Sequence, residues 1–358
     1  MKIIHVISNL ELAGAQNMCC NLLCALKDYE EDLTVISLFD SSTALTEKLT
    51  KNGIKVICLG KKMGMDLSMI RKLRKIFKKE NPDIIHAHAD VLKYVGLATL
   101  FSRVKIVHTI HTLANKESGK ADLLANKYLY RKQKAFPVAL TPVVQGSIRN
   151  KYDIPIENIP VIYNGIDLSS CIEKTSYSTN GEFKILHIGR FSEEKNHVGL
   201  INAFEILHKR VPNSSLNLIG DGPLKEKIVD YVKEKDLADS VNFLGLQPNV
   251  YPHLNETDVF ALPSIFEGMP MTLIEAMGTG LPIVASNVGG IPDMLKDGSN
   301  AILTEVNDEA IANAFIAFAE SEDLRKAYGQ QGLIDAKAFS SQIMARDYYD
   351  YYRIVSKK

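Results

Sequence analysis

The chain alternates short apolar, β-branched runs with longer amphipathic stretches along nearly all of its 358 residues. This alternation predicts parallel strands covered by helices, because two parallel strands must be joined by a long crossover connection. In the first half we expect strands at Ile3–Ser8, Leu33–Phe39, Ile54–Leu59, Asp83–Ala87, Lys105–Ile110 and Ala135–Thr141. In the second half we expect them at Phe183–Ile188, Ser215–Ile219, Val241–Leu244, Asp258–Leu262 and Pro282–Ala285. The sequence therefore predicts an α/β fold with two parallel sheets.

The pattern pauses near Tyr163–Leu168 and resumes after the polar stretch Lys174–Glu182, which is rich in Ser and Thr. We interpret this stretch as a linker. It separates a predicted domain of residues 1–168 from a second of residues 183–339. The last segment, about residues 340–358, has a helical pattern with four tyrosines, and we expect it to cross back onto the first domain.

Charge is unevenly divided, although the formal net charge is zero. Residues 1–160 hold 24 Lys and Arg against 15 Asp and Glu, and the remainder is acidic, which suggests different partners for the two halves. No apolar run is long enough to span a membrane, and the first residues do not resemble a signal peptide. The five cysteines include no Cys-x-x-Cys pair. We therefore expect reduced thiols and a cytoplasmic protein.

A helix start is predicted within Pro263–Met277, which reads PSIFEGMPMTLIEAM. Pro270 is expected in the first helical turn, where its missing N–H costs nothing. The free backbone N–H groups of Met271 and Thr272 would then favour an anion such as a diphosphate. Gly268 lets the backbone come close to a ligand. This segment therefore predicts an anion site at the start of a helix.

Two glutamates, Glu267 and Glu275, flank that helix start. A carboxylate at Glu275 is able to accept hydrogen bonds from two ribose hydroxyls, and Glu267 is placed to bind sugar hydroxyls. The setting P-S-x-x-E-G-x-P-x-x-x-x-E-A-M resembles the donor-site signature of the retaining glycosyltransferases of family 4, and the match continues through residues 280–286 and 289–292. The resemblance implies the GT-B fold, with two facing Rossmann-like domains. It also implies that Glu275 holds the nucleotide ribose, that Glu267 faces the donor sugar, and that Met271 and Thr272 face the phosphates.

Two cations, Arg190 and Lys195, share the loop after a predicted strand, in the sequence HIGRFSEEKN. A guanidinium and an ammonium suit a diphosphate leaving group, which gains negative charge as the glycosidic bond breaks. The loop resembles the family's G-R-x-x-x-x-K phosphate clamp, with Asn196 in place of the usual Gly. Because these cations supply the positive charge, and the chain has no Asp-x-Asp motif, we expect no metal and no other cofactor.

Three further positions are assigned by the same resemblance. Gly220 and Asp221 lie in a turn similar to the family's G-x-G-P turn beside the nucleotide, and Leu246 lies where backbone groups usually read the base. In the first half, Gly14 opens a helix directly after the first strand, which places N–H groups toward the donor phosphates. Ala13 stands where the family more often has a Gly.

Histidines end two neighbouring predicted strands of the first half. Alternation along Lys105–Ile110 places His108 on one face and His111 on the other. His111 matches the family's strand-end histidine, which contacts the donor sugar. His86 and His88 form a His-x-His pair, but we see no carboxylate or thiol that completes a metal site. His88 is instead expected to line the acceptor side.

A basic stretch, Lys61–Glu80, carries eight Lys or Arg residues and an apolar stripe at helical spacing, namely Leu67, Ile70, Leu73, Ile76 and Phe77. One interpretation is that Lys61–Lys79 rests on an anionic membrane surface. The other is a normal surface helix with its stripe in the core. The sequence leaves both open.

The sequence thus predicts a retaining, metal-independent glycosyltransferase. We expect it to move a hexose or N-acetylhexosamine from a nucleotide-diphosphate sugar, in keeping with a UDP-sugar, to a glycan or lipid-linked acceptor in the synthesis of a capsule or exopolysaccharide. A non-catalytic glycosyltransferase-like partner protein is the alternative. A nicotinamide dehydrogenase is disfavoured, because a single Gly14 follows the first strand where a Gly-x-Gly-x-x-Gly is needed.

Overall fold

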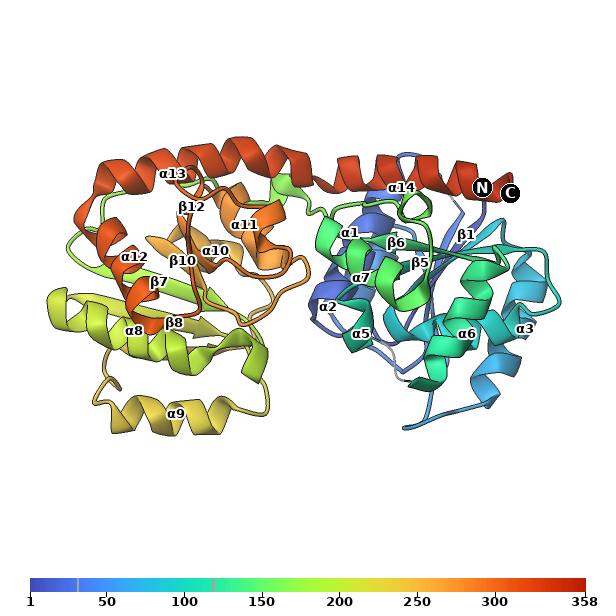
Figure 1. Ribbon diagram of the computed structural model, residues 1–358, viewed down its shortest axis with the longest axis horizontal. Coiled ribbons are helices and arrows are strands. Elements are labelled where there is room, and N and C mark those ends of the chain that lie inside the picture. Colours follow the sequence, from blue (N-terminus) through green and yellow to red (C-terminus); the bar gives the residue numbers. More distant parts are fainter. Residues whose placement is uncertain (31, 118–119) are drawn as a thin grey trace. The chain divides into compact units, whose positions relative to one another are not determined.

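The computed structural model describes residues 1–30, 32–117 and 120–358, with side chains outside 116–122. Residue contacts divide it into two compact units, Met1–Ile166 with Ser340–Lys358 and Asp167–Phe339 (Figure 1). In each unit the described residues form a six-stranded sheet with parallel pairing. The prediction of an α/β fold with two parallel sheets is therefore confirmed.

The first unit contains strands β1 (Ile3–Ile7), β2 (Leu33–Ser37), β3 (Lys55–Cys58), β4 (Ile84–His88), β5 (Lys105–Ile110) and β6 (Ala135–Ala139). Their order in the sheet is β3-β2-β1-β4-β5-β6. The helices of this unit are α1 (Gly14–Leu26), α2 (Ala44–Lys51), α3 (Ser68–Glu80), α4 (Leu92–Ala98), α5 (Ala114–Glu117), α6 (Lys120–Arg131), α7 (Pro142–Tyr152) and α14 (Ser341–Ser356).

The second unit repeats this topology with strands β7 (Phe183–Ile188), β8 (Ser214–Ile219), β9 (Val241–Gly245), β10 (Val259–Leu262), β11 (Ile283–Ser286) and β12 (Ala301–Thr304), in the order β12-β11-β10-β7-β8-β9. Its helices are α8 (His197–Arg210), α9 (Lys225–Glu234), α10 (Tyr251–Asn255), α11 (Met271–Thr279), α12 (Asp308–Glu320) and α13 (Glu322–Ala336). In both units the chain order of the strands across the sheet is 3-2-1-4-5-6, which is that of dinucleotide-binding folds.

The cores follow from burial on both faces of each sheet. Every residue of β1, β2, β4, β6, β10 and β11 is buried, as expected for parallel strands covered by helices. The first sheet is unusual in the polar side chains that it buries, because His5, His86, His88 and Thr109 are fully buried on adjacent strands. Such groups need internal hydrogen-bond partners.

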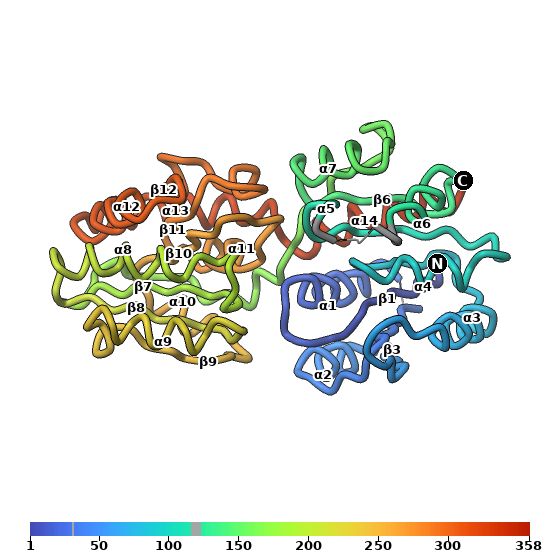
Figure 2. The backbone as a smooth tube through the Cα atoms, turned by 60° about the horizontal axis from the view of Figure 1, so that its bottom comes forward, coloured from blue at the N-terminus to red at the C-terminus, as the bar shows by residue number. Residues whose placement is uncertain are grey.

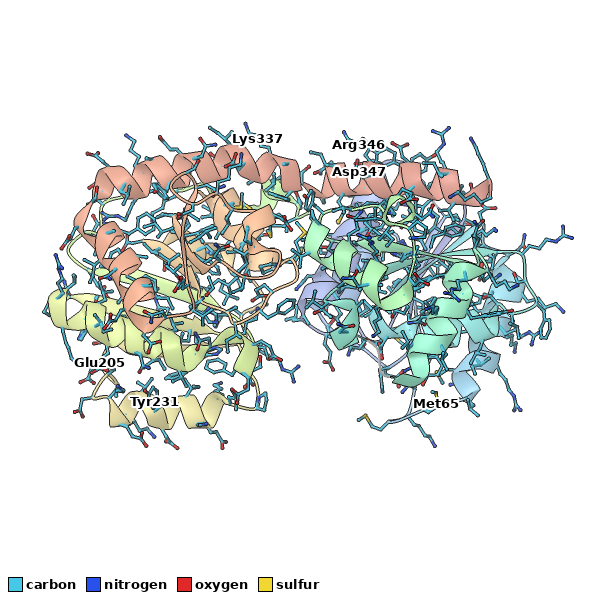
Figure 3. All side chains as sticks on the ribbon, in the orientation of Figure 1. Met65, Glu205, Tyr231, Lys337, Arg346 and Asp347 are labelled. Atoms are coloured by element: carbon cyan, nitrogen blue, oxygen red, sulfur yellow. The ribbon has the colours of Figure 1, made fainter. Side chains whose placement is uncertain are left out.

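Helix α14 returns the chain to the first unit and packs on α1. Tyr348 and Tyr352 are fully buried, and the ring of Tyr349 lies 5.1 Å from that of Tyr29. The tube in Figure 2 shows this red terminal helix running among elements of the first unit. In Figure 3, Arg346 and Asp347 lie on the outer side of α14, away from the sheet. The prediction that the C-terminal helix crosses back is confirmed.

Two features differ from the expectations. Strand β12 was not expected, because its four residues follow a turn at Gly298 and lie at a sheet edge, where two of the four side chains are only half-buried. The stretch Lys174–Glu182, interpreted as a linker, lies within the second unit. It is fixed there because Tyr177 is buried and its carbonyl accepts hydrogen bonds from the buried guanidinium of Arg325 at 2.7 and 3.0 Å.

Candidate active site

The motif-bearing loops of the second unit leave the carboxyl ends of adjacent strands β10, β7 and β8. From β7 the chain first proceeds outward to β8 and β9, and later returns to β10 on the other side. Parallel α/β sheets bind ligands beyond the carboxyl ends of the strands at such a reversal. The loops at this point are residues 189–196 after β7 and 263–270 after β10. They are joined by hydrogen bonds from Ile265 N–H to the carbonyl of Glu194 and from the Asn196 side chain to the carbonyl of Pro263.

Lys195 and Glu267 meet at this point. The Lys195 ammonium donates to Glu267 Oε1 at 2.5 Å, and the Ser264 hydroxyl donates to the same oxygen at 2.7 Å. The side chains are 21% and 10% exposed, so the pair is shielded but reachable. The sequence placed these two residues at one site without predicting that they would contact each other, and it did not single out Ser264. The Ser of the P-S-x-x-E pattern was the available signal.

The Arg190 guanidinium lies in the same loop and is exposed. Within the described part of the chain it forms no hydrogen bond or ion pair. An exposed cation without an internal partner is available to an anionic ligand. Arg190 and Lys195 therefore offer two different donors. Arg190 offers a guanidinium without a partner among the described residues, and Lys195 offers an ammonium that a carboxylate already orients.

Glu275 projects from α11 and is half-buried. Burial raises the pKa of its carboxyl group from 4.5 to about 7. Among the described residues, no hydrogen bond or ion pair satisfies this carboxylate. Because an unpaired buried carboxylate is costly, such a group is more often retained for a ligand than for stability.

Helix α11 begins at Met271, and Pro270 is its N-cap residue rather than its first helical residue as we expected. The extended backbone at Pro270 (φ −72°, ψ 122°) places the proline just before the first turn. The Thr272 hydroxyl is buried without a hydrogen-bond partner among the described residues. The carbonyl of Glu267 accepts the N–H of Gly290, and a Cβ at Gly289 would lie 2.0 Å from that carbonyl. This close approach explains why glycines follow β11.

The turn at Gly220 packs directly on the loop that carries Arg190. Gly220 has φ +142°, and a Cβ there would lie 2.0 Å from the carbonyl of Gly189. The carbonyl of Asp221 accepts the N–H of Phe191 at 3.0 Å, whereas its side chain is exposed. Leu246 follows β9 and is 61% exposed. These residues therefore extend the candidate site from β7 toward the β9 edge of the sheet.

Asn196 replaces the family's usual glycine without changing the backbone. Its φ of +53° is in the left-handed region, which Asn tolerates better than most residues. Its side chain also accepts the N–H of Gly199 and so caps α8. The departure from the family pattern is thus structurally accommodated.

Gly14 begins α1 in the first unit, directly after the loop that follows β1. Ala13 has an extended backbone (φ −148°, ψ 168°), so this position does not need a glycine. Within the part of the chain that the structure describes, no side chain caps the helix, and a Cβ at Gly14 would meet no atom within 4 Å. The first backbone N–H groups of α1 are therefore approachable.

His111 follows β5 and is half-buried. His88 Nδ1 lies 3.2 Å from His111 Nε2, and burial lowers the pKa of His111 to about 3. The alternation along β5 is as predicted. His108 interacts with Tyr130 and the carbonyl of Ala89 on one face, and Thr109 contacts Tyr348 on the other.

His5, His86 and His88 place ring nitrogens within 4.8 Å of one another. We had expected no carboxylate or thiol to complete a metal set around the His-x-His pair. However, β1 brings a third histidine beside it, and the Cys19 sulfur lies 3.9 Å from His5 Nδ1. In the described structure, five of the six ring nitrogens already have hydrogen-bond partners, and only His5 Nε2 is without one. A metal would have to replace these bonds.

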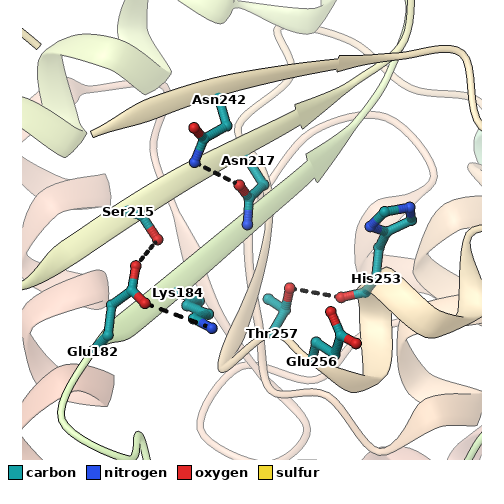
Figure 4. A pocket seen from close by; sticks show the side chains of 8 residues that line it. All are labelled: Glu182, Lys184, Ser215, Asn217, Asn242, His253, Glu256 and Thr257. Carbon is teal, nitrogen blue, oxygen red and sulfur yellow. Dashed lines mark hydrogen bonds and ion pairs between the residues drawn. The ribbon is translucent and has the colours of Figure 1, made fainter. Parts of the chain in front are cut away.

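A separate pocket of the second unit contains none of the motif residues. It is lined by Glu182, Lys184, Ser215, Asn217, Asn242, His253, Glu256 and Thr257 (Figure 4). Its side chains largely satisfy one another, for example where the Ser215 hydroxyl donates to Glu182 at 2.7 Å. We therefore assign it no role in the candidate site.

Comparison with protein families agrees with these motifs in both halves. Residues 172–333 match the model for glycosyl transferases group 1, and residues 12–170 match the model for glycosyltransferase family 4. In the described chain, no helix combines the length and apolar character that crossing a membrane requires.

Two curated relatives and one solved structure cover most of the chain. The N-acetyl-alpha-D-glucosaminyl L-malate synthase of Bacillus anthracis is 30% identical over 74% of this chain and 73% of its own length. The UDP-Gal:alpha-D-GlcNAc-diphosphoundecaprenol alpha-1,3-galactosyltransferase of Escherichia coli is 27% identical over 90% and 89%. The structure of HepE from Anabaena in complex with UDP-glucose has a TM-score of 0.86 at 20% identity, covers 99% of both chains and shares the fold.

Proposed function

Because this chain belongs to the family 4 glycosyltransferases, a family of retaining enzymes, we propose that it moves a hexose or N-acetylhexosamine from a UDP-sugar to a glycan or lipid-linked acceptor. The relative from Escherichia coli, whose name gives a sugar on diphosphoundecaprenol as its acceptor, supports the acceptor class. We further propose a role in the synthesis of a cell-surface polysaccharide such as a capsule or exopolysaccharide, at the cytoplasmic face of the membrane.

The unpaired carboxylate of Glu275 is the observation that carries this proposal. It lies one turn into α11, whose start offers the N–H groups of Met271 and Thr272 to the phosphates. A ribose with two adjacent hydroxyls would supply the donors that Glu275 lacks within the described structure. The hydrogen bond to Glu267 holds the Lys195 ammonium in place, which provides an already oriented cation for the diphosphate.

In the proposed reaction, Arg190 and Lys195 stabilise the negative charge that develops on the departing diphosphate. Glu267 orients Lys195 and accepts a hydrogen bond from a hydroxyl of the sugar. His111 and the N–H groups at Gly14 contact the sugar and phosphates, while Gly220, Asp221, Gly268 and Leu246 surround the nucleotide. The acceptor hydroxyl attacks from the face of the leaving group, whose phosphate takes its proton, so that the anomeric configuration is retained. Two side-chain cations supply the charge that a divalent metal provides elsewhere, and we propose that none is needed.

Thermal denaturation with a panel of nucleotides and nucleotide sugars tests the proposal. A bound donor at 100 times its dissociation constant is expected to add about 2.7 kcal/mol to the free energy of unfolding. Slow hydrolysis of the same donor without acceptor, unchanged by a chelator, is the expected companion result. If no donor stabilises the protein and Glu275→Ala changes nothing, the alternative of a non-catalytic partner protein is correct.

We also propose that the first unit touches an anionic membrane surface, through residues other than the helical stripe that the sequence suggested. Helix α3 begins at Ser68. Its Leu73 and Phe77 are buried in the core, and Ile70 and Ile76 pack against the core partly buried, so most of the apolar stripe is occupied. Leu67, which we had placed in that stripe, precedes the helix and is 66% exposed. The apolar groups available to lipid lie instead in the loop of residues 61–67.

In that loop Met63 is 90% exposed and Met65 is 65% exposed, and Figure 3 shows Met65 pointing away from the ribbon. The turn after α4 adds Phe101, which is 81% exposed and whose ring lies 5.2 Å from the guanidinium carbon of Arg74 on α3. Exposed apolar side chains beside exposed Lys and Arg are typical of surfaces that insert into anionic interfaces.

Sedimentation with lipid vesicles tests this contact. We expect binding to vesicles that contain phosphatidylglycerol, weaker binding at high salt, and little binding to phosphatidylcholine alone. The double variant Met63→Ser/Met65→Ser should lose several-fold in affinity. The matched control Ile334→Ser removes a side chain that is 59% exposed on α13 of the second unit, and it should bind as the parent does. Equal binding by both variants would contradict the role of the loop.

A further inference from the structure

Three histidines form a continuous hydrogen-bonded line in the first unit. His5 Nδ1 lies 3.0 Å from His88 Nε2, and His88 Nδ1 lies 3.2 Å from His111 Nε2. His5 is within β1, His88 is the last residue of β4, and His111 follows the end of β5. The line therefore leads from the buried middle of the sheet to its carboxyl edge, where ligands bind in such folds.

All three rings are neutral at physiological pH, because burial lowers the pKa of His5 and His111 to about 3 and that of His88 well below its usual range. A neutral imidazole has one N–H donor and one acceptor nitrogen. Two consecutive hydrogen bonds through His88 must therefore run in the same direction. The proton positions of the three rings are consequently coupled, so that the tautomer of one ring determines the tautomers of the other two.

The surroundings of His5, at the buried end of the line, determine the direction in which the hydrogen bonds run. His5 Nε2 is buried and has no partner among the described residues. If the line ran inward, His5 would accept at Nδ1 and carry its proton on Nε2, which would leave a buried N–H without an acceptor. If the line runs outward, His5 Nε2 carries no proton and is only an acceptor. Buried acceptors without partners are tolerated more often than buried donors. Cys19 Sγ, 3.9 Å from His5 Nδ1, is a weak partner in either case.

We propose that His5 and His88 are positioning residues that fix His111 as the tautomer with its proton on Nδ1. His5 Nδ1–H donates to His88 Nε2, and His88 Nδ1–H donates to His111 Nε2. The Nδ1–H is then the single N–H of the His111 ring, so the tautomer determines which ring atom can donate in the proposed reaction. This functional consequence rests on the proposed function, whereas the tautomer does not.

A second set of bonds supports the ring of His88 from α14. His86 stacks on His88 with ring centres 4.1 Å apart. His86 Nδ1 lies 2.6 Å from the Tyr352 hydroxyl, and its Nε2 lies 2.7 Å from the hydroxyl of Thr109. Thr109 in turn lies 2.7 Å from the hydroxyl of Tyr348. The C-terminal helix thereby restrains the histidine line from the side.

Ring ¹⁵N NMR of histidine-labelled protein near neutral pH reads the tautomers directly. We expect His111 to show a protonated Nδ1 and an unprotonated Nε2, and His5 and His88 to show the same pattern. His208 and His253, which lie in the second unit, serve as internal references. A proton on His111 Nε2 in the parent protein would overturn the proposal. Zinc detected by elemental analysis would overturn the proposal as well, if removing the zinc also removed the ring signals of His5, His88 and His111.

Two variants of similar size test the functional consequence. His88→Asn places an amide donor near the position of Nδ1, and it should keep the His111 tautomer and most of kcat. His88→Leu removes the donor and should give mixed His111 tautomers and a kcat about tenfold lower, with little change in the KM of the acceptor. Equal kcat for the two variants would refute the positioning role. If the parent turned over no donor, only the proposed function would be refuted, because NMR reads the His111 tautomer without any turnover.

Discussion

Replacing Glu275 by Gln is expected to weaken UDP-sugar binding about a hundredfold or more while making the ligand-free protein more stable above neutral pH. The loss of affinity follows because two hydrogen bonds to a charged acceptor contribute about 1.5–3 kcal/mol each. The gain in stability follows because the carboxylate is buried and has no partner among the described residues. Calorimetric titration and thermal denaturation measure the two effects.

The pH dependence has a definite sign. The carboxyl pKa of Glu275 is about 7 in the folded protein, above the usual value of 4.5, so the folded state holds more protons between these values. The free energy of unfolding therefore falls as pH rises through this window. The variant should exceed the parent by about 1–3 kcal/mol at pH 8 and equal it near pH 4.

Donor affinity of the parent should rise as pH increases toward about 7 and then level off, because the ionised carboxylate is the better acceptor. A UDP-sugar is the right probe, since its diphosphate has no group that titrates near neutrality. Glu275→Gln should bind weakly at every pH. The exposed control Glu234→Gln, at the end of α9, should change neither property. A variant that bound donor like the parent would exclude Glu275 from the ribose site.

Replacing Lys195 by Met is expected to lower kcat by about two to three orders of magnitude, which is typical for loss of one preorganised donor at a developing charge. It should also destabilise the protein by about 2–4 kcal/mol. The physical reason is that Glu267 is only 10% exposed and would lose its ion-pair partner, with Ser264 as its remaining hydrogen-bond donor among the described residues.

The double variant Lys195→Met/Glu267→Gln separates the two effects. Removing both charges should restore much of the stability and none of the activity, because the uncompensated charge disappears while the leaving group remains unsupported. Lys209→Met is the matched control, since Lys209 also pairs with a glutamate, Glu205, but is 72% exposed. It should change stability little. Recovery of activity in the double variant would show that Lys195 serves only the ion pair.

Much of this organisation was readable from the sequence. The period of the apolar runs predicted eleven of the described strands, because parallel strands buried on both faces are short, apolar and β-branched. Strand β12 escaped because a four-residue edge strand leaves little pattern. The segment Glu267–Glu275 and the Arg190–Lys195 loop were recognised because both follow strands and combine charge with glycine or proline.

Other features depend on strand order, which local pattern does not encode. The sequence placed Lys195 and Glu267 at one site, but their ion pair requires that β7 and β10 be neighbours at the reversal of the sheet. His5 drew no attention as a lone histidine in an apolar strand, and it matters only because β1 lies beside β4.

By itself, the sequence determined the parallel α/β fold, the family and the residue types of the donor site, since these depend on periodicity and on short motifs. The tertiary structure alone decided which of those groups are satisfied and which are not. It paired Lys195 with Glu267, left Glu275 without a partner among the described residues, and joined His111 to His88 and His5. Burial and hydrogen bonding set protonation states, and both arise from contacts between residues far apart in the chain.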